Sequence, residues 1–473
     1  MTASLIETDY LVVGGGATAM AFVDTLLSES DAKVVMVDRQ HRPGGHWNDA
    51  YSFVRLHQPS EYYGVASREL SRGSKDQLGS NAGLYGLASG AEVLAYFDQV
   101  MQEHFLPSGR VHWFPMSEYS EGLEGTHQVK SLTSGLIVPI QVRKKVVNAT
   151  HIQTSLPLTH PPQYRVQAGV VCLPLNRLPQ LSRPYTAYTV VGSGKTGVDA
   201  CLWLLEHGVS PSSIRWIMPR DAWLLNRANL QPGLENFENS MGSLVGQFES
   251  IIGASSVAHL FEQLEARGLL LRVDPTVEPT MYRCATVSQP ELEQLRRIGD
   301  VVRLGRVKSL ESTRVVLEQG EVAADADTLY IDCSARAFGS QPEVAVFDGD
   351  RINLLPVRVC QVSISMALIA FVESHVSGLE EQNLLCQVVP LPDRPIDWLR
   401  MWAVTLTNMG RWRQHEGVTS WLSRCRLNPL AVFMRGVTAE HSDKIALAKE
   451  VAVKAATAAA KLPSLLAYEL THS

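Results

Sequence analysis

A pattern of strand, glycine-rich turn, helix and second strand constrains this sequence more than any other feature. Its first copy begins with the apolar run Asp9 to Val13, which ends in the turn Gly14 to Gly16. Residues 17–29 then have helical character and contain no proline, and the β-branched run Lys33 to Val37 follows. This succession predicts a βαβ unit at the start of the chain.

The same pattern returns in the middle of the chain. Tyr188 to Val191 predicts a strand, and the turn Gly192 to Gly197 follows it directly. Val198 to His207 predicts a helix, and Ile214 to Met218 predicts the next strand. Two separate nucleotide-binding units are therefore expected in one chain.

These two units predict an α/β fold with two Rossmann-type dinucleotide-binding domains, the second inserted into the first, plus a mixed helical region. The expected boundaries are a first domain over residues 1–185, a second over 186–324 with a helical insertion, and 325–473 for the return to the first domain and a C-terminal helical region. A chain of 473 residues is long enough for two or three domains.

Composition excludes several other classes of protein. Apolar residues make up 45% and charged residues 19%, which is an ordinary globular balance. The net charge of −6, without a block of Lys or Arg, argues against nucleic acid as a partner. No apolar stretch is long enough to span a membrane, and no secretory signal precedes the first strand. The seven cysteines form no CxxC pair, so we expect free thiols in the cytoplasm and no metal site.

The first turn has the spacing Gly14-x-Gly16-x-x-Ala19. The first glycine permits a tight turn, the second lets the backbone approach a pyrophosphate, and the small third residue allows the helix to pack closely on the strand. The N-terminus of the helix offers free N–H groups to phosphates. Asp38, at the end of the second strand, can accept hydrogen bonds from ribose hydroxyls.

The second turn has the spacing Gly192-x-Gly194-x-x-Gly197, but its second strand ends at Arg220 rather than at an acid. An arginine there suits the 2′-phosphate of NADP, and Lys195 and Arg227 are further candidate ligands. A neighbouring carboxylate, Asp221, would repel a phosphate if it pointed inward. The pattern favours NADPH over NADH.

A third motif, Gly44-Gly45-His46-Trp47, follows Asp38 and precedes the segment Arg55 to Ser60. With the two glycine turns it resembles the class B flavin-dependent monooxygenases, which include the flavin-containing monooxygenases and the Baeyer–Villiger enzymes. The resemblance covers residues 8–65 and 185–227. The late strand Asp327 to Ala335 resembles the strand that returns to the FAD domain of that family.

The resemblance implies an FAD- and NADPH-dependent monooxygenase that inserts one oxygen atom from O₂ into a small organic substrate through a flavin C4a-(hydro)peroxide. Gln58 lies near the position of an asparagine beside the flavin C4a in flavin-containing monooxygenases, and its neighbour His57 is the second catalytic candidate. Gln361 and Ser363 precede an apolar helix that approaches the pyrimidine end of the ring in related flavoproteins. The predicted cofactor-binding residues are, for FAD, Gly14, Gly16, Ala19, Asp38, Arg39, Gly45, Trp47, Gln361 and Ser363 and, for NADPH, Gly192, Gly194, Lys195, Thr196, Gly197 and Arg220.

One signature of that family is missing. The linker between the two turns should carry an FxGxxxHxxx(W/F) pattern, and residues 151–185 do not contain it. Two alternatives therefore stay open: an NAD(P)H-dependent flavin oxidoreductase without oxygen insertion, and a non-catalytic flavoprotein. The sequence does not specify the substrate.

Two C-terminal features are expected to serve packing. Trp398 and Trp402 stand at helical i, i+4 spacing, which is more typical of a core than of an aromatic substrate pocket. The Ala-rich segment Ile445 to Leu462 predicts a surface helix that packs on its own domain or on the partner subunit of a homodimer.

Overall fold

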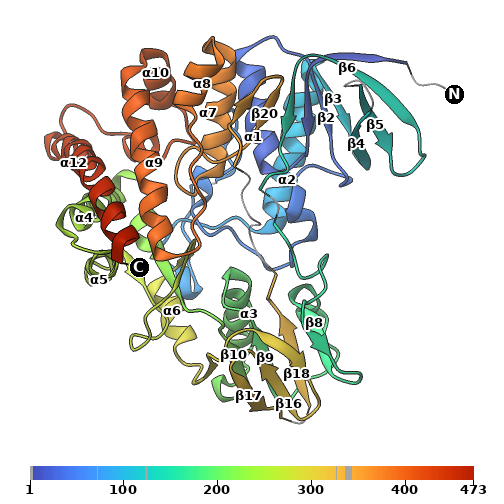
Figure 1. Cartoon of the computed structure of the whole chain (residues 1–473), viewed down its shortest axis with the longest axis vertical. Helices are drawn as coiled ribbons and strands as arrows, with labels where there is room; N and C mark the ends of the chain where they lie inside the picture. Colours follow the sequence, from blue (N-terminus) through green and yellow to red (C-terminus); the bar gives the residue numbers. More distant parts are fainter. Residues whose placement is uncertain are drawn as a thin grey trace.

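The first glycine turn lies in a lobe that is built on an eight-stranded mixed sheet. The computed structural model describes residues 4–71, 73–122, 126–152, 154–325, 327–335 and 343–472. In the upper lobe of Figure 1, the turn joins β1 (Ile6–Val13) to α1 (Ala17–Glu29), and β2 (Val34–Val37) runs parallel to β1. All four residues of β2 are buried, as expected of a β-branched run inside a parallel sheet.

The sheet around β1 has the order β19-β20-β6-β1-β2-β3, and β5 and β4 extend it beside β6. Its other strands are β3 (Val111–Phe114), β4 (Ser117–Glu121), β5 (His127–Ser131), β6 (Ile137–Asn148), β19 (Phe347–Asp348) and β20 (Arg351–Asn353). Helix α1 packs against α7 (Val362–His375), in which Ser363 to Val372 are all buried. A helix that is apolar nearly all round is suited to this enclosed position.

The second glycine turn lies in the lower lobe of Figure 1. It joins β9 (Ala187–Val191) to α3 (Lys195–Glu206), and β10 (Ile214–Ile217) follows. The sheet has the order β14-β10-β9-β18-β8, with every pair parallel; its other strands are β8 (Val171–Pro174), β14 (Asp300–Val302) and β18 (Thr328–Asp332). A small sheet beside it contains β7 (Arg165–Val166), β15 (Val307–Leu310), β16 (Arg314–Leu317) and β17 (Gly320–Ala323).

The assignment of Asp327 to Ala335 as the return strand was wrong. Its strand β18 pairs with β9 and β8, so it belongs to the second sheet. The chain re-enters the first sheet only at β20, which pairs with β6. At the other boundary, β8 already lies in the second sheet, before residue 186. A buried apolar strand is compatible with any parallel sheet, and only its pairing partners show to which of the two sheets it belongs.

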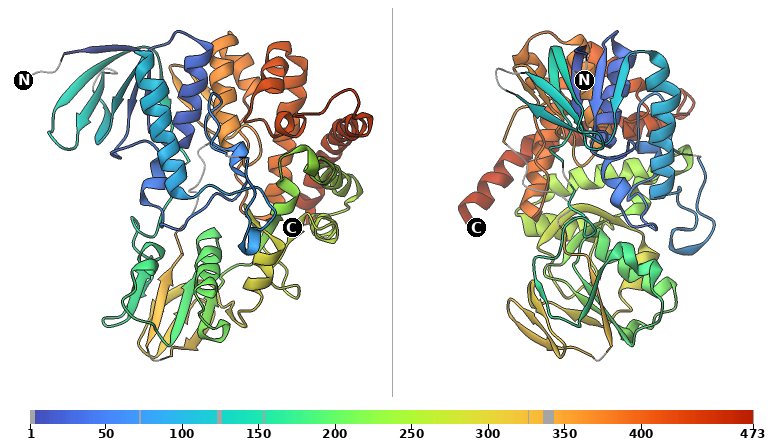
Figure 2. Two further views of the ribbon diagram at one scale, coloured as in Figure 1. Left: turned by 180° about the vertical axis from the view of Figure 1, so that it is seen from behind. Right: turned by 90° about the vertical axis from the view of Figure 1, so that its right-hand side faces the viewer.

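A third, mostly helical layer flanks both sheets, and Figure 2 shows it from two further sides. Its main helices are α4 (Phe237–Gly253), α5 (Val257–Ala266), α9 (Pro395–Gln414) and α12 (Ser442–His472), around a sheet of β11 (Ala222–Asn226), β12 (Leu270–Leu271) and β13 (Met281–Val287). The other α-helices of the described residues are α2 (Gly90–Val100), α6 (Gln289–Leu295), α8 (Leu379–Leu385), α10 (Glu416–Arg424) and α11 (Pro429–Phe433).

The C-terminal helix α12 packs on α4 and α9 of its own chain. Trp398 and Trp402 lie in the core of this layer and are 1% and 9% exposed, which confirms the packing interpretation. Among the described helices, none is long and apolar enough to cross a bilayer.

Candidate functional site

The turn Gly14 to Gly16 has the backbone that a dinucleotide cradle requires. Gly14 has φ of +111°, a conformation that L side chains rarely adopt. Gly16 is the N-cap of α1 and leaves the first N–H groups of the helix free of a side-chain cap. Gly45 lies directly opposite, because a Cβ built on it would come within 2.9 Å of Gly16 Cα. Only glycines permit this close approach of the two segments.

The acid predicted for the ribose lies beside this turn. The Asp38 carboxylate accepts hydrogen bonds from the backbone N–H groups of Gly15 and Gln40. Burial raises the pKa of the Asp38 carboxyl, and these two N–H groups oppose the shift. Ala19 is fully buried on α1. Arg39 points elsewhere: it forms a surface ion pair with Glu118 at 2.7 Å, and its side chain is 71% exposed.

Residues 44–60, which follow β2, contact the second lobe through Tyr51, which donates to Asp199, and through the backbone oxygen of His57, which accepts from Arg227. Trp47 is buried, and its Nε1 donates to the Tyr63 hydroxyl at 2.8 Å. His57 is half-buried, and so is Gln58. Burial, together with the charges of Lys195 and Arg227, holds the pKa of the His57 imidazole well below its usual range. The structure thus brings a catalytic candidate of the first unit close to a cofactor-binding candidate of the second.

The three glycines of the second turn have distinct environments. Gly192 has φ of +125°, and its carbonyl oxygen accepts from Trp216 Nε1 at 2.8 Å. A Cβ on Gly197 would lie 2.1 Å from that same oxygen, so the helix packs on the turn too closely for any side chain. A Cβ on Gly194 would meet nothing within 4 Å. The open side of the turn is therefore at Gly194, where a pyrophosphate approaches in this motif.

The charged residues of the second unit are engaged with other side chains. In the first turn of α3, Lys195 pairs with Asp199, and Thr196 is the next residue. Asp199 also accepts from the hydroxyl of Tyr51, which reaches across from the first lobe. The sequence does not predict this contact, because Tyr51 and Asp199 are 148 residues apart in the chain.

Arg220 lies three residues after the end of β10 and forms an ion pair with Asp393 at 2.7 Å. It also donates to Thr280. The carboxylate of its neighbour Asp221 is paired with Arg303, which donates two hydrogen bonds of 2.8 and 3.0 Å to it. This pairing reduces the repulsion that Asp221 would exert on a phosphate. Arg220, which the sequence predicts as a ligand of the 2′-phosphate, is thus itself paired with a carboxylate.

The interpretation of Arg227 as a phosphate ligand was wrong. This residue is 1% exposed. Its guanidinium donates to Asn81, to Glu291 and to the backbone oxygens of His57 and Thr286. A buried arginine with this many partners holds protein segments together rather than a ligand.

Two predicted flavin neighbours carry polar atoms that lack a partner in the described part of the chain. Gln361 is the N-cap of α7, and Ser363 is 3% exposed in its first turn. Gln361 Oε1 and Ser363 Oγ are both buried without a hydrogen bond. Buried polar atoms are nearly always paired, so these two fit a bound group with its own donors and acceptors.

Cys284 and Cys360 form a disulfide, with a Cα–Cα distance of 6.5 Å. The expectation that all thiols stay free was therefore wrong for this pair, which joins β13 to the residue before Gln361. The other five cysteines are free. Burial raises the pKa of every one of these thiols, to about 11 at Cys172 and Cys425 and further at the rest.

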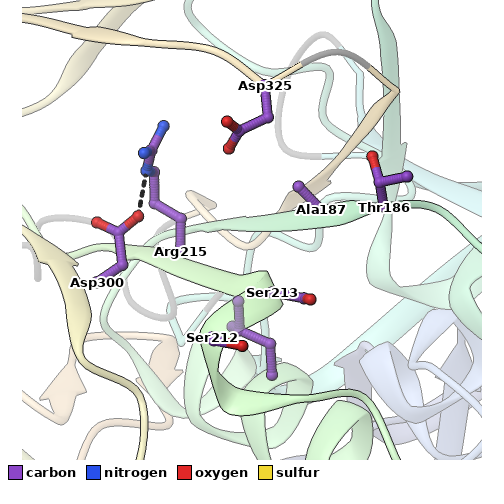
Figure 3. A pocket seen from close by; sticks show the side chains of 8 residues that line it. Thr186, Ala187, Ser212, Ser213, Arg215, Asp300 and Asp325 are labelled. Atoms are coloured by element: carbon purple, nitrogen blue, oxygen red, sulfur yellow. Dashed lines mark hydrogen bonds and ion pairs between the residues drawn. The ribbon is translucent and has the colours of Figure 1, made fainter.

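A pocket of about 360 Å³ opens at the opposite end of the second sheet (Figure 3). It is lined by the first residues of β9 and β10, including Arg215, which pairs with Asp300 at 2.8 Å. Ligands of open parallel sheets bind at the carboxyl ends of the strands. This pocket lies at the amino ends and is not the cofactor site.

Two mycobacterial proteins are similar in sequence to this chain over most of its length. The uncharacterized protein Rv2000 of Mycobacterium tuberculosis is 49% identical over 432 residues, which cover 91% of this chain and 79% of the relative. The uncharacterized protein Mb2023 of Mycobacterium bovis matches to the same extent. The chain belongs to their family. No protein-family model matches it.

Among solved structures, the ε-caprolactone-bound form of a cyclohexanone monooxygenase is similar, with a TM-score of 0.50 and 14% identity. The match covers 78% of this chain and 87% of that enzyme. At this identity the likeness shows the fold. It confirms the predicted α/β fold with two dinucleotide-binding domains, as in the class B monooxygenases.

Proposed function

We propose that this protein is an enzyme, an FAD- and NADPH-dependent monooxygenase that acts on a small organic substrate with O₂. The observation that carries the proposal is the pair of glycine cradles, each at the carboxyl end of a strand with parallel neighbours, β1 and β9. Gly14 and Gly192 both have positive φ, and Gly16 and Gly194 both cap a helix N-terminus. The fold shared with a cyclohexanone monooxygenase supports the same proposal.

The residues of the first cradle fit FAD. Gly14 permits the tight turn, Gly16 and Gly45 let their two segments approach closely beside the helix N-terminus, and Asp38 would bind the adenosine ribose. The unpartnered oxygens of Gln361 and Ser363 suit the polar edge of the flavin ring. When bound, FAD supplies two-electron transfer and the reaction with dioxygen.

The second cradle would hold NADPH through Gly192, Gly194 and the N–H groups at Lys195 and Thr196, with Arg220 at the 2′-phosphate. His57 would then stand near the second cradle, because the charge of Lys195 acts on its imidazole and Arg227 donates to its backbone oxygen. Since its imidazole stays neutral at physiological pH, it can donate or accept a hydrogen bond without adding a charge near the reacting atoms. Gln58 offers an amide beside it. Because NADPH is an intracellular cofactor, we propose that the enzyme works in the cytoplasm.

The disulfide favours one second candidate, an NADPH-dependent flavin oxidoreductase without oxygen insertion. Cys360 is the residue before Gln361, so a reducible bond lies one residue away from a predicted flavin neighbour. The absence of the linker signature points in the same direction. Electrons would then leave to an external acceptor.

The experiment is NADPH oxidation by the FAD-loaded protein under air, with a panel of ketones, amines and sulfides. Oxygenated product in step with NADPH consumption supports the monooxygenase. NADPH consumption that yields only hydrogen peroxide across the panel, or that needs a quinone or disulfide acceptor, rejects it in favour of the second candidate. Protein that binds no flavin after incubation with FAD rejects both.

A further inference from the structure

Two arginines and one carboxylate form a compact cluster at the adenosine end of the second cradle. Arg220 leaves the end of β10, where the second strand of a Rossmann unit meets the adenosine ribose. Arg283, from the middle of β13, donates to Asp393 Oδ1 at 2.7 Å through its Nε. Arg220 donates to Asp393 Oδ2 at 2.7 Å. The carboxylate of Asp393 therefore lies between two guanidinium groups.

This arrangement resembles the way in which arginines hold a phosphate. Guanidinium groups bind carboxylate and phosphate oxygens with the same fork of N–H donors. The cluster is open to solvent, because the side chains of Arg220, Arg283 and Asp393 are 29%, 31% and 46% exposed. A ligand can reach these arginines without disturbing the core.

The backbone of Asp393 has two anchors besides the hydrogen bond that Arg220 donates to its oxygen at 3.2 Å, so only its carboxylate needs to move when the arginines release it. Its backbone oxygen accepts from the backbone N–H of Tyr282 at 3.1 Å, and its own N–H donates to Asp397 in the first turn of α9. The carboxylate is held in its charged form as well. Partial burial works to raise the pKa of Asp393, but the hydrogen bonds from Arg220 and Arg283 outweigh it and hold the pKa below its usual range.

We propose that Asp393 occupies the 2′-phosphate site of NADPH, and that the phosphate binds by displacing this carboxylate from Arg220 and Arg283. The inference rests on the proposed use of NADPH and adds two residues to it: Arg283 as a second phosphate ligand and Asp393 as an internal competitor. Asp393 lowers the affinity for every 2′-phosphorylated nucleotide. It leaves nucleotides without that phosphate unaffected.

The test is calorimetric titration of the FAD-saturated protein with adenosine 2′,5′-bisphosphate, and with ADP as the ligand that lacks the 2′-phosphate. Asp393→Asn keeps the size of the side chain and removes its charge. We expect it to tighten binding of the bisphosphate on the order of tenfold, because one like charge leaves the site. Arg283→Gln should weaken the same binding on the order of tenfold, and neither variant should change the affinity for ADP.

The matched control is Asp300→Asn. Asp300 also pairs with an arginine, Arg215, but at the amino ends of β14 and β10 (Figure 3). This variant should leave both affinities unchanged. Equal or weaker bisphosphate binding by Asp393→Asn, with wild-type binding intact, overturns the inference alone. If the wild-type protein binds neither the bisphosphate nor NADP⁺, the proposed use of NADPH fails and the inference fails with it.

Discussion

Alanine at two glycines of the second turn should separate the role of packing from the role of ligand binding. At Gly197, the added Cβ would lie 2.1 Å from the oxygen and 3.0 Å from the carbonyl carbon of Gly192. Both contacts are with backbone, so the helix must move away from the turn. At Gly194, the added Cβ meets nothing within 4 Å, and the φ of −77° suits any residue.

The two substitutions differ in their expected cost to stability. Overpacking costs about 1–3 kcal/mol, and backbone contacts place Gly197→Ala at the upper end, since alanine's better helix propensity returns only about 1 kcal/mol. A net loss of about 2 kcal/mol corresponds to a fall in Tm of roughly 4–8 °C for a domain of this size. Gly194→Ala loses only the preference of an N-cap for glycine over alanine, which is below about 1 kcal/mol.

For binding of NADP⁺ the order is reversed, and we expect the larger effect from Gly194→Ala. The methyl group at Gly194 would stand on the open side of the turn, where the pyrophosphate approaches, and should weaken NADP⁺ at least about tenfold, or about 1.4 kcal/mol. Thermal unfolding followed by circular dichroism gives the stabilities, and calorimetric titration with NADP⁺ gives the affinities. A stable Gly197→Ala, or a Gly194→Ala that unfolds early but binds normally, would refute this assignment of the turn.

Three further predictions address the other parts of the site. Gly16→Glu should abolish FAD binding, because a charged side chain would enter the approach of the pyrophosphate; a folded, yellow variant contradicts this. The pKa of His57 is low in the folded state and about 6.5 in the unfolded chain, so the free energy of unfolding should fall as the pH drops below about 6.5, where only the unfolded chain takes up this proton. Urea unfolding at a series of pH values should show that the free energy of unfolding of His57→Gln falls less steeply than that of the wild-type protein. Identical pH dependence of the two proteins rejects this prediction. Thiol titration of the denatured, unreduced protein should find the five free cysteines, and reduction should release the thiols of Cys284 and Cys360; a full count of seven thiols before reduction contradicts the disulfide.

The local elements of both cradles could be predicted from sequence. The helix expected over residues 17–29 is α1, Ala17–Glu29, and the strand expected from Tyr188 begins one residue earlier, at Ala187. These elements are determined by nearby residues: a β-branched run, a glycine that can take positive φ, and an uninterrupted helical stretch. The fold class followed from finding the unit twice.

Features that depend on distant pairing could not be predicted in this way. The sequence of β18 is compatible with either sheet, and its true partners, β8 and β9, lie more than a hundred residues earlier in the chain. Arg227 is a basic residue near a phosphate motif, and nothing local indicates that it is buried against Asn81 and Glu291. The cysteines of the disulfide are separated by 76 residues and form no motif.

The proposed cofactor specificity also combines a local motif, which the sequence predicts, with contacts between distant segments, which it does not. The glycine spacing around Gly192 shows where a diphosphate can bind, but it is the same for NADH and NADPH. Discrimination depends on charges at the ribose, and the charges proposed for it come from three distant segments: Arg220 after β10, Arg283 on β13 and Asp393 before α9. Because the carboxylate of Asp393 belongs to the helical layer and not to the Rossmann unit, the proposal predicts that a change in how α9 packs alters the preference between the two cofactors without any change in the glycine motif. Under this proposal the helical layer, which the sequence predicts least well, tunes the nucleotide preference of the second Rossmann unit, which the sequence predicts best.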